Sequence, residues 1–322
     1  MATGVAHGFA AVGGQVEIMC GISGIMYKKS RTRGLAPIGE DLVKMLESLT
    51  HRGKDSSGVT VSGEDAEGAL IVRIWTDDAD RAADVLARSE EAVHRVEGVI
   101  TSKATRDEYL RLTVNYEGDV SSLAEALLNT PGVELHSIGY QSEVVKDVGT
   151  PVNMDLRHQI GRLTGTHGIG HVRMATESKV DISHAHPFWA YPFPDVTVVH
   201  NGQLTNYHNL KRAYEDQGHR FQTENDSELI AVYLADKLAR GESLHRALSD
   251  SLEQLDGTFT YLVSTRDGLG YAKDRWSAKP LVTMETDEVV AIASEEVALR
   301  SVFSEEIARL EPQQNEVMTW LL

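Results

Sequence analysis

Residues 20–29, CGISGIMYKK, open with the only cysteine of the chain and continue as an apolar, glycine-containing run with the length of a β-strand. Residues 40–53, EDLVKMLESLTHRG, follow with leucine and methionine at intervals of three and four, which predicts an amphipathic helix. Residues 56–63, SSGVTVSG, predict a second strand. A strand, a helix and a strand are therefore expected in close succession after Cys20.

The remainder of the chain continues this mixture of strands and helices. Residues 66–164 alternate the two patterns and predict an α/β insert. Residues 165–176 and 196–206 predict buried strands. Predicted helices come next, and then short strands separated by turns, which are typical of an antiparallel sheet. The fold class is therefore predicted to be α+β, with one domain over residues 20–65 and 165–322 and the insert between them.

Residues 1–19, MATGVAHGFAAVGGQVEIM, are rich in glycine and alanine and show no sustained period. We expect a leader that is removed or not translated. Met19 directly precedes Cys20, so either event would leave Cys20 as the first residue, with a free α-amine of pKa about 8. That amine is able to take the proton of the thiol without a histidine.

Composition excludes several classes of function. The chain has 322 residues and a net charge of −17, which argues against a nucleic-acid or anionic-lipid partner. No apolar stretch approaches a membrane span, and the first nineteen residues contain no lysine or arginine for a secretory signal. A cytoplasmic protein is predicted. A single cysteine allows no internal disulfide, and by frequency it is more often a small buried hydrophobe than a nucleophile.

The segment GHVRMAT, residues 170–176, places Arg173 in an otherwise apolar strand. A guanidinium is costly there unless a carboxylate meets it through paired hydrogen bonds. The carboxylate of a substrate would serve, and so would an acidic side chain of the protein in an internal salt bridge.

The segment VVHNG, residues 198–202, places the amide of Asn201 beside the backbone N–H of Gly202 at the expected end of a strand. Two donors aimed at one point form an oxyanion hole, where each contributes about 3–4 kcal/mol. An ordinary Asn-Gly hairpin turn is the alternative.

The segment FQTENDSELIA, residues 221–231, places Asp226 near the start of a predicted helix. A carboxylate in this position is suited to capping the helix. Alternatively, it accepts a hydrogen bond from a substrate ammonium group.

Histidines are concentrated between His167 and His200, which raises the alternative of a metal-dependent hydrolase. Their spacing matches no metal signature such as H-E-x-x-H, and no acidic residue is interleaved at ligand spacing between His167 and His171. We therefore predict no metal site.

Taken together and in this order, CGISGI, HRGKDSSG (51–58), GHVRMAT, AHP (185–187), VVHNG and TENDSELIA resemble the class II glutamine amidotransferases, which are N-terminal-nucleophile hydrolases. The resemblance covers residues 20 to about 65 and 165 to about 300. It implies a four-layer αββα sandwich and an enzyme that hydrolyses the side-chain amide of L-glutamine through a cysteine thioester to glutamate and ammonia.

The resemblance also implies roles for individual residues. Cys20 would be the nucleophile and, through its α-amine, the base, while Asn201 and Gly202 would bind the oxyanion. Arg173 would bind the glutamine α-carboxylate and Asp226 its α-amino group. Thr176 and His200 would line the substrate pocket.

This chain departs from the family at several positions, with Lys54 where proline is frequent and Met174 where tryptophan is frequent. The shorter members also lack the insert, and no ammonia-consuming domain follows the expected glutaminase. The chain is therefore similar to the small subunits of glutamate-synthase-like complexes, including N-methylglutamate synthase. That similarity implies a hetero-oligomer whose other subunits carry FMN and iron–sulfur clusters, with no cofactor in this chain. A partner-independent γ-glutamyl amide hydrolase and a catalytically silent regulatory subunit are the alternatives.

Overall fold

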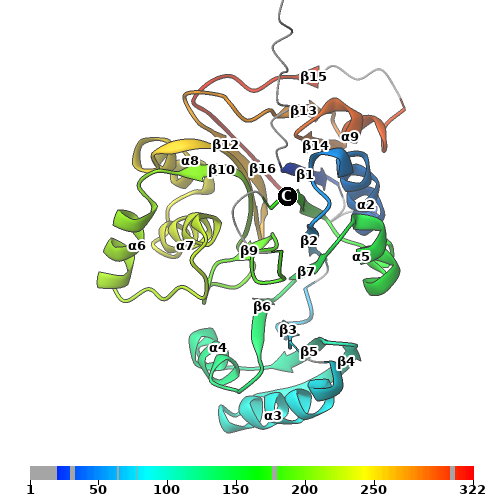
Figure 1. The fold of residues 1–322 in the computed structure, drawn as a ribbon, viewed down its shortest axis with the longest axis vertical. Coiled ribbons are helices and arrows are strands. Elements are labelled where there is room, and N and C mark those ends of the chain that lie inside the picture. Colours follow the sequence, from blue (N-terminus) through cyan, green and yellow to red (C-terminus); the bar gives the residue numbers. More distant parts are fainter. Residues whose placement is uncertain (1–19, 30–32, 64, 78, 176–179, 305–308) are drawn as a thin grey trace, which may run out of the picture.

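Two large sheets lie face to face at the centre of the molecule, helices cover their outer faces, and a smaller sheet with its own helices lies at one end (Figure 1). The computed structural model describes residues 20–322 except 30–32, 64, 78, 176–179 and 305–308. The predicted leader, residues 1–19, lies outside the described residues. Within the described part of the chain, no helix combines the length and apolar character needed to cross a membrane.

The first sheet is built around β1 (Gly21–Tyr27), the strand predicted from the residues that follow Cys20. β1 pairs in antiparallel fashion with β14 on one side and β8 on the other. This sheet has seven strands, in the spatial order β15 (Arg309–Leu310), β13 (Val282–Glu285), β14 (Val289–Ala293), β1, β8 (His167–Arg173), β2 (Ser56–Ser62) and β7 (Ser142–Val148).

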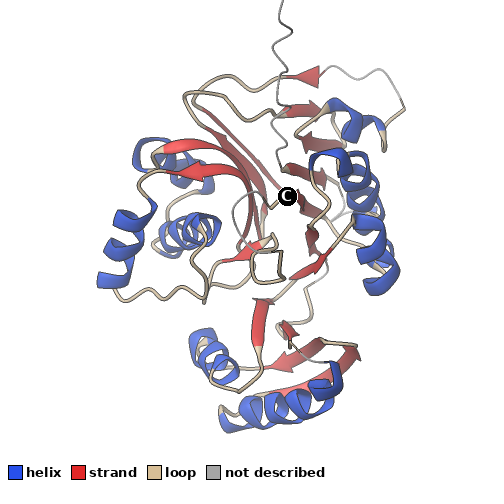
Figure 2. Cartoon of the chain, viewed as in Figure 1, coloured by secondary structure: helices blue, strands red, loops and turns tan. Residues whose placement is uncertain are grey.

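Helix α2 (Ile38–Ser48) covers the outer face of the first sheet with its apolar stripe. The helices α5 (Pro151–His158) and α9 (Glu296–Arg300) pack against α2, as does the 3-10 turn η3 (Ile160–Arg162) (Figure 2). The helix approaches β8 closely because Gly170 has no side chain: a Cβ there would lie 2.9 Å from Leu46 Cδ1.

The second sheet supplies the other half of the domain. Its outer face packs against α7 (Asp226–Ala239) and α8 (Leu244–Gln254), and α6 (Tyr207–Asp216) packs against α7. Its five strands, all antiparallel, have the spatial order β16 (Glu316–Leu321), β12 (Gly268–Lys273), β11 (Gly257–Thr265), β10 (Thr197–Leu204) and β9 (Phe188–Trp189).

The inner faces of the two sheets enclose a shared apolar core. Ile22 and Met26 of β1 meet Val199 of β10 and Leu262 of β11 there, and all four are fully buried or nearly so. Successive side chains of a strand point to opposite faces, so Ile25 packs on the side of α2 instead. Each such side chain contributes about 1.5–3 kcal/mol on burial. The result is a helix–sheet–sheet–helix sandwich, and the predicted α+β four-layer fold is confirmed.

The smaller sheet forms a separate unit with its own core. Its helices α3 (Ala82–Arg95) and α4 (Val120–Leu128) pack on one face, against Leu70, Val72 and Ile74 of β3. The chain order is β3, α3, β4, β5, α4, β6, the split βαβ arrangement of ferredoxin-like modules. The strands, in spatial order, are β4 (Val99–Arg106), β5 (Tyr109–Asn115), β3 (Leu70–Trp75) and β6 (Glu134–Gly139).

A short turn between β6 and β7 connects this unit to the main domain. The carboxylate of Asp195 accepts hydrogen bonds from the backbone N–H groups of Tyr140, Gln141 and Ser142, at 3.1, 3.1 and 2.9 Å. The next strand, β7, then pairs with β2 in the first large sheet. The predicted insert over residues 66–164 thus includes β7 and α5, which pack with the main domain.

Candidate active site

Cys20 lies immediately before the central strand β1 and is half-buried. Its carbonyl oxygen accepts hydrogen bonds from Asn201 Nδ2 at 2.9 Å and from Arg52 Nε at 3.1 Å. Its thiol Sγ lies 3.9 Å from the carbonyl oxygen of Met174. Arg52 is itself held by an ion pair with Glu295. The backbone of Cys20 is therefore fixed by a side chain from β10 of the second sheet and by one from the 3-10 turn η1 (Thr50–Arg52) that follows α2.

The pairing of β1 with β8 brings Arg173 to the same end of the first sheet as Cys20. Gly21 pairs with Val172 in this register, so Cys20 is level with the end of β8. Arg173 is 5% exposed. This arginine is therefore buried, as predicted from its place in a mostly apolar strand.

The segment HRGKDSSG shapes the backbone around Arg173. Asp55 donates its N–H to the Arg173 carbonyl at 3.0 Å, and its Oδ2 accepts the N–H of Ala175 at 2.7 Å. Gly53 packs against the same peptide, where a Cβ would lie 2.4 Å from the Arg173 carbonyl carbon. Thr176, predicted to line the pocket, lies outside the described residues.

Asn201 and Gly202 lie within β10, where they pair with Thr260 and Phe259 of β11. The expectation that they end a strand in a turn was wrong, because the strand continues to Leu204. Gly202 has a φ of +147°, and a Cβ there would lie 2.1 Å from the carbonyl oxygen of Thr258. Only glycine fits this position. The preceding residue, Asn201, has its side-chain amide beside Cys20.

Asp226 is the first residue of α7, and Asn225 rather than Asp226 caps the helix, since its side chain accepts the N–H of Ser227. Asp226 Oδ2 accepts the N–H of Leu204 at 2.9 Å, and its Oδ1 lies 3.5 Å from His200 Nδ1. Burial alone would raise the pKa of Asp226, but the charge and hydrogen bonds of His200 and Leu204 outweigh it and lower the pKa. Asp226 is therefore an anion at the end of β10.

Three buried histidines lie near these groups. The rings of His171 and His186 stack with centroids 4.0 Å apart. The Ser227 hydroxyl lies 2.9 Å from His186 Nε2 and 3.0 Å from His200 Nδ1. Burial lowers the pKa of His171 to about 3 and holds that of His186 well below its usual value, so both rings are neutral at pH 7. Among the described residues, no group of three or more histidine, cysteine, aspartate or glutamate side chains is placed to hold a metal ion.

The charge around Cys20 bears on its reactivity. Burial raises the pKa of the Cys20 thiol, against the opposing effects of a hydrogen bond with the Met174 backbone and of the Arg173 and Arg52 guanidinium groups. The thiol is therefore protonated at neutral pH, and it needs a base before it can act as a nucleophile.

Comparison with known proteins identifies the family. A family model described as a glutamine amidotransferase domain matches residues 171–301. A putative glutamine amidotransferase from Methanothermobacter thermautotrophicus is 40% identical over 300 residues, which cover 91% of this chain and 97% of the relative. The chain belongs to the class II glutamine amidotransferases. The glutamine amidotransferase-like protein GlxB of Rhizobium meliloti is 38% identical to this amidotransferase over 312 residues, or 94% of this chain and 98% of GlxB.

Solved structures share the fold of this amidotransferase. The glutamine phosphoribosylpyrophosphate amidotransferase from B. subtilis, complexed with ADP and GMP, matches with a TM-score of 0.57 and 20% identity, over 93% of this chain and 47% of that one. A second structure, described as the allosteric regulatory enzyme of purine biosynthesis, matches with a TM-score of 0.59 and 21% identity. The chain spans about half the length of these two proteins. The sandwich fold is thus shared with these two structures.

Sequence reasoning assigned no role to Arg52, Asp55 or Ser227. Arg52 holds the Cys20 carbonyl, Asp55 holds the chain on both sides of Met174, and Ser227 joins two histidines. Arg52 and Asp55 both lie in HRGKDSSG, which was recognised only as a family motif. The motif was visible in the sequence, but the roles of Arg52 and Asp55 depend on contacts with distant segments that only the structure shows.

Proposed function

We propose that this amidotransferase hydrolyses the side-chain amide of glutamine to glutamate and ammonia through a thioester on Cys20. The observation that carries the proposal is the double hold on the Cys20 carbonyl by Asn201 and Arg52, beside the buried Arg173. This geometry suits a residue whose thiol and α-amine must both be positioned. Removal or non-translation of residues 1–19 would supply the amine.

In this mechanism the α-amine of Cys20 takes the thiol proton, and the thiolate attacks the amide carbon of glutamine. The negative oxygen that forms is bound by the Asn201 amide and the Gly202 N–H. Collapse of this intermediate breaks the C–N bond, and the proton held by the α-amine passes to the leaving nitrogen to give ammonia. Water then hydrolyses the thioester, which yields glutamate and restores the thiol.

Glutamine is held at its other end by opposite charges. The Arg173 guanidinium pairs with the α-carboxylate and the Asp226 carboxylate accepts from the α-ammonium group. The lowered pKa of Asp226 keeps it ionised at neutral pH. His200, which lies beside Asp226, lines the pocket. The family resemblance assigns the same role to Thr176, which lies outside the described residues.

The ammonia passes to a separate synthase partner of the glutamate-synthase-like or N-methylglutamate synthase kind, whose subunits would carry FMN and iron–sulfur clusters. The support is the resemblance of the sequence motifs CGISGI, GHVRMAT and VVHNG to the glutaminase subunits of such complexes. The alternatives are a partner-independent γ-glutamyl amide hydrolase and a silent regulatory subunit.

One assay separates these possibilities. We expect the purified chain that begins at Cys20 to convert glutamine to equal amounts of glutamate and ammonia. Chains that co-purify from the source organism should raise the rate and consume the ammonia. Full activity with no co-purifying flavoprotein would support the independent hydrolase, and absence of glutamate with and without those chains would contradict the catalytic proposal.

A further inference from the structure

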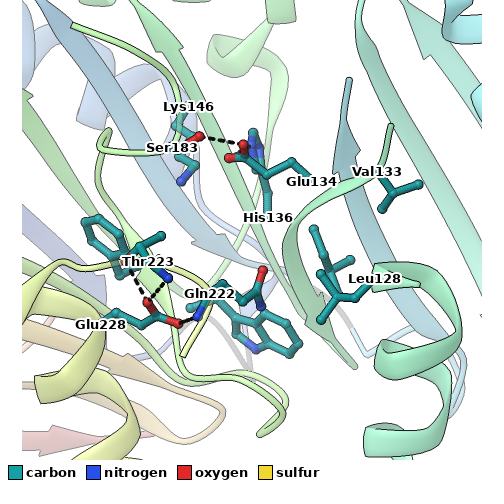
Figure 3. A pocket seen from close by; sticks show the side chains of 12 residues that line it. Leu128, Val133, Glu134, His136, Lys146, Ser183, Gln222, Thr223 and Glu228 are labelled. Carbon is teal, nitrogen blue, oxygen red and sulfur yellow. Dashed lines mark hydrogen bonds and ion pairs between the residues drawn. The ribbon is translucent and has the colours of Figure 1, made fainter. Parts of the chain in front are cut away.

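A cavity of about 310 Å³ lies between the ferredoxin-like unit and the main domain. The ferredoxin-like unit supplies residues from α4 and β6, and the main domain supplies residues from β7, β9 and the start of α7. Figure 3 shows the polar side chains in two groups, one with Lys146, Ser183, Glu134 and His136, the other with Gln222, Thr223 and Glu228. The volume is at the lower end of that of small-molecule sites.

The first observation that points to a ligand in this cavity is the environment of Lys146. The side chain is buried, and its Nζ donates to the Ala185 carbonyl at 3.1 Å and lies 5.3 Å from the centroid of the Phe188 ring. Among the described residues no carboxylate forms an ion pair with its Nζ, although the charges of Glu134, Glu228 and Asp181 act on it from farther away. A buried ammonium group without a paired anion is costly. Burial accordingly lowers the pKa of Lys146.

His136 is a second, independent sign. It is 4% exposed, and its buried Nε2 has no hydrogen-bond partner of acceptable geometry, although it lies 3.3 Å from Glu134 Oε1. Burial lowers the pKa of His136 to about 4, so the ring is neutral at pH 7. A buried polar atom in this state is rare unless another molecule satisfies it.

Glu134 provides the opposite charge. One carboxylate oxygen accepts the Ser183 hydroxyl at 2.6 Å. Burial opposes ionisation, but the neighbouring His136 and Lys146 and the Ser183 hydroxyl lower the pKa of Glu134 to about 2. The cavity wall thus carries the Lys146 ammonium group and the carboxyl groups of Glu134 and Glu228, and no direct ion pair joins Lys146 to either acid among the described residues. Its remaining wall is apolar and includes Leu128, Val133 and Trp189.

We propose that this cavity binds a small zwitterion, an α-amino acid with an apolar side chain. Its carboxylate would pair with Lys146, its ammonium group with Glu134, and its side chain would pack against Leu128, Val133 and Trp189. His136 Nε2 would complete the polar contacts. This claim concerns binding and does not depend on the catalytic proposal.

A ligand bound in the cavity would also affect the proposed glutamine site, because both adjoin the start of α7. The carboxylate of Glu228, in the cavity wall, accepts the N–H groups of Gln222 and Thr223, both at 2.7 Å. These residues directly precede the turn that ends at Asp226. A ligand in the cavity therefore contacts the segment that positions the proposed ammonium-binding carboxylate. An effect of this ligand on glutamine affinity rests on the proposed function, whereas the binding of the ligand in the cavity does not.

Isothermal titration of the full chain tests the binding, with L-leucine and L-phenylalanine as probes. The matched compounds 4-methylpentanoate and 3-methylbutylamine lack the ammonium and carboxylate groups, respectively. Because an amino acid could also enter the glutamine site, Arg173→Lys is titrated in parallel. We expect Arg173→Lys to retain leucine or phenylalanine binding, and Lys146→Met to weaken it at least about tenfold, the loss of one charged hydrogen bond.

Val133→Trp, which fills the cavity without removing a charge, guards against a folding defect in Lys146→Met and should also abolish binding. Thermal unfolding of both variants shows whether they are folded. Binding that is lost in Arg173→Lys but kept in Lys146→Met would place the amino acid in the glutamine site and overturn the proposal. Equal affinity for leucine and 4-methylpentanoate, or no binding of either amino acid, would overturn it as well.

Discussion

Replacing Cys20 with alanine is expected to lower the rate of glutamate release from glutamine by about 10⁴-fold or more, as removal of a catalytic nucleophile does in other hydrolases. No second cysteine exists to replace it. The fold should be unaffected, because the backbone hydrogen bonds to the Cys20 carbonyl do not involve the thiol. The measurement is an enzymatic assay of glutamate, with thermal unfolding of both proteins.

Cys20→Ser is the matched variant for this experiment. It replaces the thiol by a hydroxyl group, which is a weaker nucleophile, and keeps the α-amine in place. We expect its activity to lie well below that of the parent and at or above that of Cys20→Ala. Glutamate release by Cys20→Ala at the parent rate would show that the nucleophile lies elsewhere.

Asn201→Ala is expected to lower kcat for glutamine hydrolysis by about 10²- to 10³-fold, the usual effect of removing one oxyanion-hole donor. The loss has two sources in this protein. The amide is proposed to bind the oxyanion, and its Nδ2 also donates to the Cys20 carbonyl at 2.9 Å. Steady-state kinetics measure kcat and KM separately, and the effect should fall mainly on kcat.

Asn206→Ala is the control for this second prediction. Asn206 follows β10 closely, and its Nδ2 donates to the Gln254 carbonyl at 2.9 Å, on the surface. Its removal should change stability slightly and leave kcat unchanged. If Asn201→Ala retained the parent kcat, neither the oxyanion role nor the positioning of Cys20 by this amide would hold.

The main domain was predictable because its strands and first helix carry clear periodic patterns. β1 is an apolar run of strand length, β2, β8 and β10 are runs of the same length that contain glycine and aliphatic residues, and α2 repeats leucine and methionine at helical spacing. Each of these elements buries a face against a neighbouring layer, so its pattern is a direct consequence of its place in the sandwich. Their arrangement in two sheets came from the resemblance to a family.

Elements of the ferredoxin-like unit and its junction were harder to predict. β4 (Val99–Arg106) was missed because it is an edge strand whose residues are largely exposed, so no apolar alternation marks it. β7 and α5 were not separated from the insert. Their membership of the main domain depends on the pairing of β7 with β2, which no local pattern encodes.

The site was predicted unevenly for the same physical reason. Cys20, Arg173 and Asn201 were selected from residue type and local context, and the structure brings Cys20 and Asn201 into contact. Arg52 was not selected, because its hydrogen bond to Cys20 joins segments 32 residues apart. The roles of all these residues in catalysis remain predictions until kinetic data test them.

The most direct test of the central claim is covalent labelling of the active protein with a glutamine analogue that carries a diazoketone in place of the side-chain amide. Intact mass and peptide mapping then locate the label. We predict one label per chain, on a peptide that begins at Cys20 and carries a free α-amine. A label on another residue, or glutaminase activity in protein that still contains residues 1–19, would contradict the account.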